Sequence, residues 1–150
     1  MRGLAPVGLL LASACSQPQA PPPQTADTEP PRIAVALRLE DAPEGASGAA
    51  VDMPASKASL VLIRESGERE AHDLGIYLGA CAPRPPGDGE LVRVECWWAG
   101  SGAHLVALRG ERDIVVTSTP IDEMTGAGHP QERARIPLEP PDAELDPITP

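Results

Sequence analysis

The stretch that decides the fold is Leu91-Val-Arg-Val-Glu-Cys-Trp-Trp98, in which apolar and mixed positions alternate. This period of two is typical of a β-strand, because successive side chains of a strand point to opposite faces. One face, which we expect to lie against a core, carries Val92, Val94, Cys96 and Trp98. The other, which we expect to meet water or a partner, carries Leu91, Arg93, Glu95 and Trp97.

The two cysteines of this region are expected to form a disulfide bond. Cys96 belongs to the inward set, and Cys81 precedes it across residues 82–89, which are rich in Pro, Gly and Asp and favour a reversal of the chain. In the chain-entropy model, closing a loop of about 15 residues stabilises the fold by roughly 3 kcal/mol. The alternative is a pair of buried free thiols that act as small hydrophobic groups.

The start of the chain has the character of an export signal. Arg2 precedes an apolar run over residues 4–11, which is too short for the roughly 20 residues of a membrane-spanning helix. The sequence Leu11-Ala-Ser-Ala-Cys15 resembles the lipobox of bacterial lipoproteins. The resemblance covers about the first 16 residues, and it departs from the usual pattern at Ala12, where a large aliphatic residue is common.

The resemblance implies a signal peptide over residues 1–14 and a lipid on Cys15, the new N-terminus. The identity of Ser16 then implies sorting to the outer membrane of the cell envelope. Lipidation would also account for the odd number of cysteines, since it leaves Cys81 and Cys96 as a pair in an oxidising compartment. The alternative is an ordinary signal peptide cleaved after Ala14, with Cys15 a free thiol.

Charge and composition narrow the possible partners and the core. The net charge of −10 argues against nucleic acid and against electrostatic adhesion to anionic lipid. With two Trp, one Tyr and no Phe, the chain must build its core from Val, Leu, Ile and Ala. We therefore expect membrane attachment only through the lipid, with envelope proteins or glycans as further partners.

The chain divides into a tether, a domain and a tail. Residues 15–31 are Pro-rich and predict an extended polyproline tether of about 3.1 Å per residue. Residues 32–138 have the length of one β domain with a single core. Residues 139–150 are acidic and Pro-rich, so we expect them to lie outside the core. Both terminal segments are expected to be disordered.

Within the domain, alternation predicts about seven short strands and no helix. They are placed at residues 32–39, 59–65, 68–73, 91–98, 103–108, 113–119 and 133–138. Residues 40–58 and 121–131 are expected to be surface loops, and Pro137 places the last strand at an edge. This pattern indicates an all-β domain, a small antiparallel β-sandwich or a partly open barrel.

Few residues suggest chemistry. His72 and Asp73 are a His/acid neighbour pair near a strand end, and they could serve as part of a metal site or as a general base if the fold supplied further groups. The alternative is two exposed strand residues. Ser101 lacks the strand-to-helix context of a nucleophile elbow. We expect no metal site and no cofactor.

Trp97 beside Arg93 on the mixed face is the strongest candidate for a contact surface, together with the loops over residues 40–58 and 82–89. Alternatively, Trp97 packs under a loop or under the Arg93 stem. The favoured hypothesis is a non-enzymatic envelope lipoprotein whose β domain is a binding or structural accessory module. The alternative is a small exported hydrolase or metal-dependent enzyme that uses His72 and Asp73.

Overall fold

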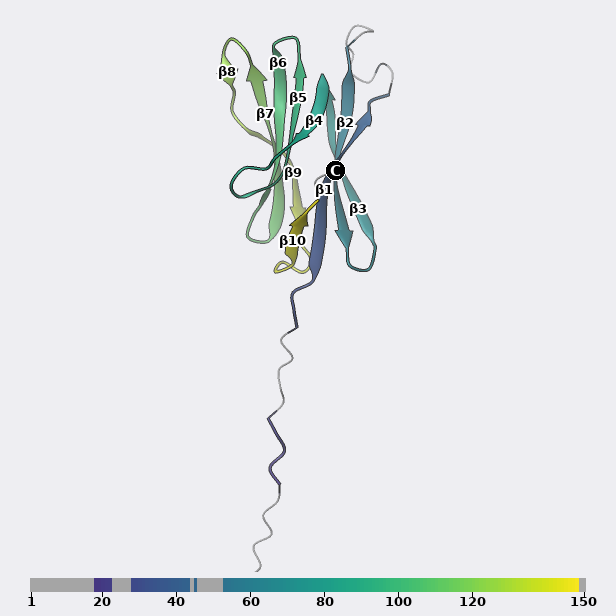
Figure 1. Ribbon diagram of the computed structural model, residues 1–150, viewed down its shortest axis with the longest axis vertical. Helices are drawn as coiled ribbons and strands as arrows, with labels where there is room; N and C mark the ends of the chain where they lie inside the picture. The colour runs from purple at the N-terminus through teal and green to yellow at the C-terminus, as the bar shows by residue number, and fades with distance from the viewer. Residues whose placement is uncertain (1–17, 23–27, 44, 46–52, 149–150) are drawn as a thin grey trace, which may run out of the picture.

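The computed structural model describes residues 18–22, 28–43, 45 and 53–148, and within them the chain forms two β-sheets and no helix (Figure 1). The first sheet has the order β10-β1-β2-β3, with bounds Glu144–Pro147, Arg32–Asp41, Ala55–Arg64 and Arg69–Leu78. The second sheet has the order β4-β5-β6-β7-β8, with β9 also paired to β7. Its strands are β4 Ala80–Arg84, β5 Glu90–Trp98, β6 Ser101–Arg109, β7 Asp113–Asp122, β8 Gly126–Ala127 and β9 Gln131–Pro137.

The two sheets enclose one apolar core, which confirms the predicted sandwich. Burial alternates along β1, where Ile33, Val35 and Leu37 are buried and their neighbours are more exposed. Inward residues of the other strands complete the core: Leu60, Leu62, Val94, Cys96, Leu105, Ala107, Ile114, Val116 and Ile136. Aliphatic side chains supply almost all of it, as the composition predicted. The aromatic exception is Tyr77 at 7% exposure.

The C-terminal boundary of the domain differs from the prediction. β10 pairs in parallel with β1, from Arg32 opposite Glu144 to Val35 opposite Pro147. Ala143 is 1% exposed, and Leu145 packs against the core. The expectation that residues 139–150 lie outside the core is therefore wrong for this segment, and the domain extends to at least residue 147. Four residues that pair in parallel along one edge give too short an alternation to be recognised in a Pro-rich sequence.

The structure has ten strands in its described residues, where about seven were predicted. The additional strands are the short β4, β8 and β10. The loop expected at residues 40–58 is shorter, because β1 continues to Asp41 and β2 begins at Ala55. The edge position of Pro137 is confirmed, since β9 pairs only with β7 in the described part of the chain.

The chain passes from the first sheet to the second at Gly79, between β3 and β4. Gly79 has a φ of 102°, which favours glycine, and its N–H donates to the Pro54 carbonyl at 2.7 Å. A Cβ at this position would lie 2.5 Å from the Trp97 carbonyl oxygen. This close approach makes β4 the edge partner of β5 and sets Cys81 directly opposite Cys96.

Candidate functional site

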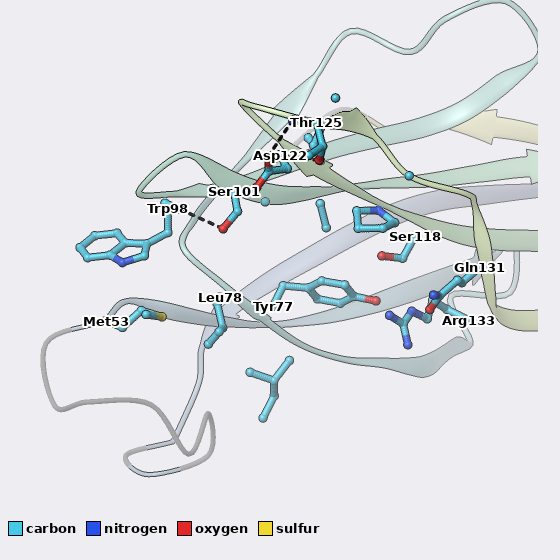
Figure 2. Close-up of a pocket in the computed structure, with 17 residues that line it drawn as sticks. Met53, Tyr77, Leu78, Trp98, Ser101, Ser118, Asp122, Thr125, Gln131 and Arg133 are labelled. Atoms are coloured by element: carbon cyan, nitrogen blue, oxygen red, sulfur yellow. Dashed lines mark hydrogen bonds between the residues drawn. The ribbon is translucent and has the colours of Figure 1, made fainter.

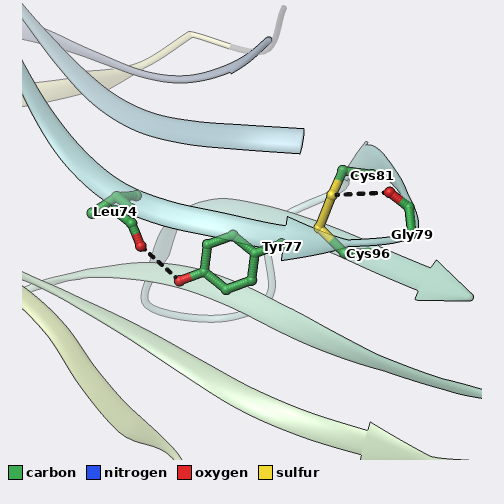
Figure 3. Close-up of a disulfide and its surroundings, with 5 residues drawn as sticks. All are labelled: Leu74, Tyr77, Gly79, Cys81 and Cys96. Carbon is green, nitrogen blue, oxygen red and sulfur yellow. Dashed lines mark hydrogen bonds between the residues drawn. A yellow bond between two sulfur atoms is a disulfide. The ribbon is translucent and has the colours of Figure 1, made fainter. Parts of the chain in front are cut away.

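The predicted disulfide is confirmed: Cys81 on β4 is bonded to Cys96 on β5 (Figure 3). Cys96 is fully buried and Cys81 is half-buried. The bond fastens the short edge strand β4 to the central part of the second sheet, immediately after the crossover at Gly79. It therefore fixes the position at which β3 leaves the first sheet, and β3 is one wall of the candidate site.

The candidate site is a groove of about 680 Å³ at one end of the sandwich, between β3 and the ends of β6, β7 and β8 (Figure 2). Its apolar lining comprises Met53, Ile76, Tyr77, Leu78, Trp98, Ala103, Pro120 and Ile121. Its polar side chains are Ser101, Ser118, Asp122, Thr125, Gln131 and Arg133. A mostly apolar cleft with a few polar groups is typical of ligand sites.

Tyr77, Ser118 and Arg133 lie together in this groove. The Tyr77 hydroxyl donates to the Leu74 carbonyl at 3.0 Å (Figure 3). The Arg133 guanidinium carbon lies 5.9 Å from the Tyr77 ring centroid, a cation–π arrangement. Burial raises the pKa of Tyr77, while the Arg133 charge and a Ser118 hydrogen bond oppose that rise. Ser118 is 2% exposed, so a polar group lies at the base of the cleft.

Arg133 has no carboxylate partner among the described residues, which distinguishes it from most arginines of the domain. Arg135, two positions along β9, contacts both Asp113 at 2.8 Å and Glu132 at 2.7 Å. The interaction that the structure shows for Arg133 is with the neutral ring of Tyr77. In a chain of net charge −10, the groove thus contains a cation whose charge is not neutralised by a neighbouring acid.

Asp122 also lines the groove, but its carboxylate is occupied. Its Oδ1 accepts hydrogen bonds from the N–H groups of Met124 and Thr125, both at 2.9 Å, and from the Thr125 hydroxyl at 3.2 Å. These hydrogen bonds, that from Thr125 first, lower the pKa of Asp122. The Asp122 carboxylate therefore stabilises the turn before β8 through these hydrogen bonds.

The two tryptophans have different surroundings. Trp97 is 37% exposed on the outer face of the second sheet, and its ring covers Gly102, whose added Cβ would lie 2.9 Å from Trp97 Cε3. Trp98 is 39% exposed and lines the groove mouth, so the prediction that it faces the core is wrong. By alternation Trp98 falls on the same side of β5 as Val94 and Cys96, but it is the last residue of β5, beside the Ala99-Gly100 turn and beyond the buried core.

Arg93 lies on the same outer face as Trp97, as predicted, but its side chain is paired with Glu90. The Arg93 guanidinium is hydrogen-bonded to Glu90, with Nε 2.8 Å from Oε2. This interaction raises the pKa of Arg93 and lowers that of Glu90. Four strand positions separate Arg93 from Trp97, about 13 Å along the strand. A joint contact surface of these two residues stays a prediction.

His72 and Asp73 do not converge, because consecutive strand residues face opposite sides of β3. His72 Nε2 lies 3.0 Å from Glu70 Oε1. Asp73 Oδ2 lies 2.9 Å from Lys57 Nζ, and Asp73 Oδ1 accepts from the Gly75 N–H at 2.8 Å. The Lys57 hydrogen bond is the main reason that the pKa of Asp73 is lowered. In the described segments, no three His, Cys, Asp or Glu residues form a group that could hold a metal ion.

Sequence reasoning missed the residues of the groove. Tyr77 belongs to Leu74-Gly-Ile-Tyr-Leu-Gly79, a segment between two predicted strands for which the sequence predicts no element. Ser118 and Arg133 come from strands 40 and more positions later in the chain. The sequence offered one signal for this site, the single Tyr in an apolar segment. It could not indicate that Ser118 and Arg133 lie beside Tyr77, because that depends on how β3 packs against the second sheet.

The predicted lipid attachment site, Cys15, and the signal segment lie outside the described residues. Where the chain is described, it contains no helix of the length and apolarity needed to cross a membrane. Comparison of the chain with protein-family models, with curated proteins and with solved structures found no match in any of the three.

Proposed function

We propose that this chain is a cell-envelope lipoprotein, anchored in the outer membrane by a lipid on Cys15, whose β-sandwich is a binding module. The observation that carries the proposal is the groove beside Trp98, which combines an exposed indole with a cation, a buried hydroxyl and an amide. The module binds an envelope protein or glycan there and performs no chemistry on it.

The groove supports a binding role because Trp98 is an exception to the usual burial of large apolar side chains. It is one of only three aromatic residues in the chain, and it is 39% exposed at the mouth of a cleft. Aromatic residues at such positions are common anchors for proteins and sugars, since one ring supplies a large contact area at low entropic cost.

The Cys81–Cys96 disulfide supports export. Disulfide bonds persist mainly in oxidising compartments, such as the periplasm, and are rare in the cytosol. This agrees with the lipobox resemblance at Cys15, which is an independent observation on a different part of the chain. The alternative of a hydrolase or metal-dependent enzyme has no converging groups at His72 and Asp73 to support it.

The groove is tested by Trp98→Ala, with Trp97→Ala as the matched control. Both variants remove an indole of similar exposure from adjacent positions, but only Trp98 lines the groove. We expect Trp98→Ala to lower the capture of partners from solubilised envelopes by about tenfold or more, since a central aromatic anchor is worth about 2 kcal/mol. Equal capture by the two variants would contradict a groove-based function.

The anchor is tested separately by Cys15→Ala, measured as the share of the chain in the membrane fraction. We expect this variant to leave the membranes, because acyl chains supply about 0.8 kcal/mol per buried methylene group. Retention of Cys15→Ala in the membrane fraction, at the level of the unaltered chain, would refute lipid anchoring and leave the groove hypothesis standing.

A further inference from the structure

We infer that the groove binds an extended polypeptide segment, which adds as a strand to the free edge of β3 and places its C-terminal carboxylate on Arg133. This inference rests on the proposed binding function and specifies its partner. It combines three observations: the direction of the β3 backbone groups, the shape of the opposite wall, and the unneutralised charge of Arg133.

The first observation is that β3 has unpaired backbone groups where it borders the groove. Within the described residues β3 pairs only with β2. The Gly79 N–H donates to the Pro54 carbonyl on the β2 side, and the Ala55 carbonyl accepts from Ala42 on the opposite side, next to β1. Ala55 therefore cannot bond to Leu78, its partner in register.

Hydrogen-bonded and non-hydrogen-bonded pairs alternate in an antiparallel ladder. Since Leu78 is in a non-hydrogen-bonded pair, Ile76, two residues earlier, is in one as well. Tyr77, opposite Ser56, is a hydrogen-bonded position, whereas Ile76, opposite Lys57, is not. The N–H and C=O groups of Ile76 and Leu78 thus point away from β2. Both residues also line the groove, so two donors and two acceptors are available along one wall.

The remainder of β3 is protected against strand addition, which confines the site to this end. A bulge interrupts the pairing of β2 with β3 at Ala58 and Ser59, and Gly75 has a φ of 96°. Bulges and charged side chains are the usual devices that protect an edge strand. Beyond Gly75 they are absent, and Ile76 and Leu78 instead expose apolar side chains at 39% and 42%.

The second observation is the open wall across the groove. Gly126 and Gly128 both line it. A Cβ added to Gly126 would meet no atom within 4 Å, whereas one added to Gly128 would lie 2.8 Å from Pro120 Cγ, so the open part of the wall is at Gly126. Residues without side chains leave room for a second backbone to approach. The groove volume of about 680 Å³ lies within the range of about 300–1,000 Å³ that accommodates small ligands and short segments.

The third observation sets the direction of the added strand. Figure 2 places Trp98 and Leu78 toward one end of the groove and Arg133 and Gln131 toward the other. A segment antiparallel to β3 therefore enters beside Trp98 and ends near Arg133. The acidic surface of the chain disfavours a strongly acidic ligand, but a single terminal carboxylate can pair with Arg133, which has no carboxylate partner among the described residues.

The test uses the full mature chain and short random peptides displayed with free C-termini. An enriched peptide is synthesised as the free acid, as the C-terminal amide, and with N-methyl groups at alternate backbone nitrogens. We expect the amide to bind about 10–100-fold more weakly than the acid, which corresponds to a charge-assisted hydrogen bond. Arg133→Gln should remove that difference. N-methylation in the register facing β3 should abolish binding, whereas N-methylation in the other register should not.

A second variant tests the backbone of the edge directly. Leu78→Pro removes an N–H that the fold does not use, and Leu78→Ala, the control, removes the side chain and keeps the N–H. We expect Leu78→Ala to weaken peptide binding only by the lost contact of one side chain in the groove, and Leu78→Pro to abolish it, so that the difference between the two variants reports the missing N–H. If Leu78→Pro fails to fold, the N-methylated peptides give the same answer on the unaltered chain.

Equal binding of acid and amide, or indifference to N-methylation, would overturn the inference. So would Trp98-dependent binding of envelope glycans with no enrichment of any peptide, although the proposed function would then survive. If Trp98→Ala captures envelope partners as well as the unaltered chain, the proposed function itself fails.

Discussion

Removal of the Cys81–Cys96 bond should destabilise the domain by an amount that its position predicts. The bond closes a loop with a sequence separation of 15, for which loop-closure entropy gives about 3 kcal/mol. In the double variant Cys81→Ala/Cys96→Ala, loss of the buried Cys96 sulfur adds about 1 kcal/mol of packing. The expected total of about 4 kcal/mol is a large share of the roughly 5–15 kcal/mol that stabilises a domain.

Urea unfolding followed by tryptophan fluorescence measures this loss. With an m value of about 1–3 kcal/mol per molar, the midpoint should fall by roughly 1.3–4 M. The unaltered chain in strong reductant is the control, and it should lose about 3 kcal/mol, since it keeps both sulfur atoms. A loss below about 1 kcal/mol in the double variant would refute the reasoning. Such a small loss would mean that residual structure around residues 80–98 already restricts the unfolded chain without the disulfide bond.

Three further changes have defined outcomes. Ala99 has a φ of 48° in the two-residue turn between β5 and β6, a conformation that Asn adopts more readily than Ala. Ala99→Asn should therefore stabilise the domain by about 1 kcal/mol and raise its melting temperature. An unchanged or lower melting temperature would contradict this. Because the folded-state pKa of Tyr77, the only tyrosine, is raised, its contribution to stability is present below the ordinary pKa of about 10 and is lost as pH rises through the folded value. The absorbance of tyrosinate should therefore appear above the pH at which it appears in the unfolded chain, and Arg133→Gln should move it higher. Deletion of residues 143–150 removes the buried Ala143, the packing of Leu145 and the Ala143 carbonyl that accepts from Arg109. We expect this deletion to lower the free energy of unfolding, measured by urea unfolding, by about 2–3 kcal/mol. No change would show that β10 is dispensable.

The fold was largely predictable because its long strands have a regular period of two. Burial alternates over the central residues of β1, β5 and β7, which leaves little choice of face there. At the start of β5 a register shift between Glu90 and Val92 breaks the alternation, so that Leu91, predicted to face outward, is buried beside Val92. The short strands were not predictable in this way. β10 depends on a parallel partner more than 100 positions away, and β4 depends on the approach of Gly79 to Trp97.

The candidate site was less predictable than the fold. The alternation put Trp98 on the same side of β5 as Val94 and Cys96, but alternation carries no information about where a strand extends beyond its core. The groove depends on the end of β5, the start of β6, the end of β3 and residues of β7, β8 and β9, so it arises from packing between strands that are distant in sequence. Trp97 is exposed on the outer face, as predicted, and its ring also covers Gly102.

The path of β1 has a consequence for how the molecule is presented. Residues 28–31 lead away from the lower end of β1 in Figure 1, whereas the upper end reaches Ala42, whose N–H donates to Ala55 near Met53 and the groove. Ten strand residues, about 33 Å, separate the two ends. If the chain is attached through its first residues, as proposed, the groove lies at the end of the domain opposite that attachment.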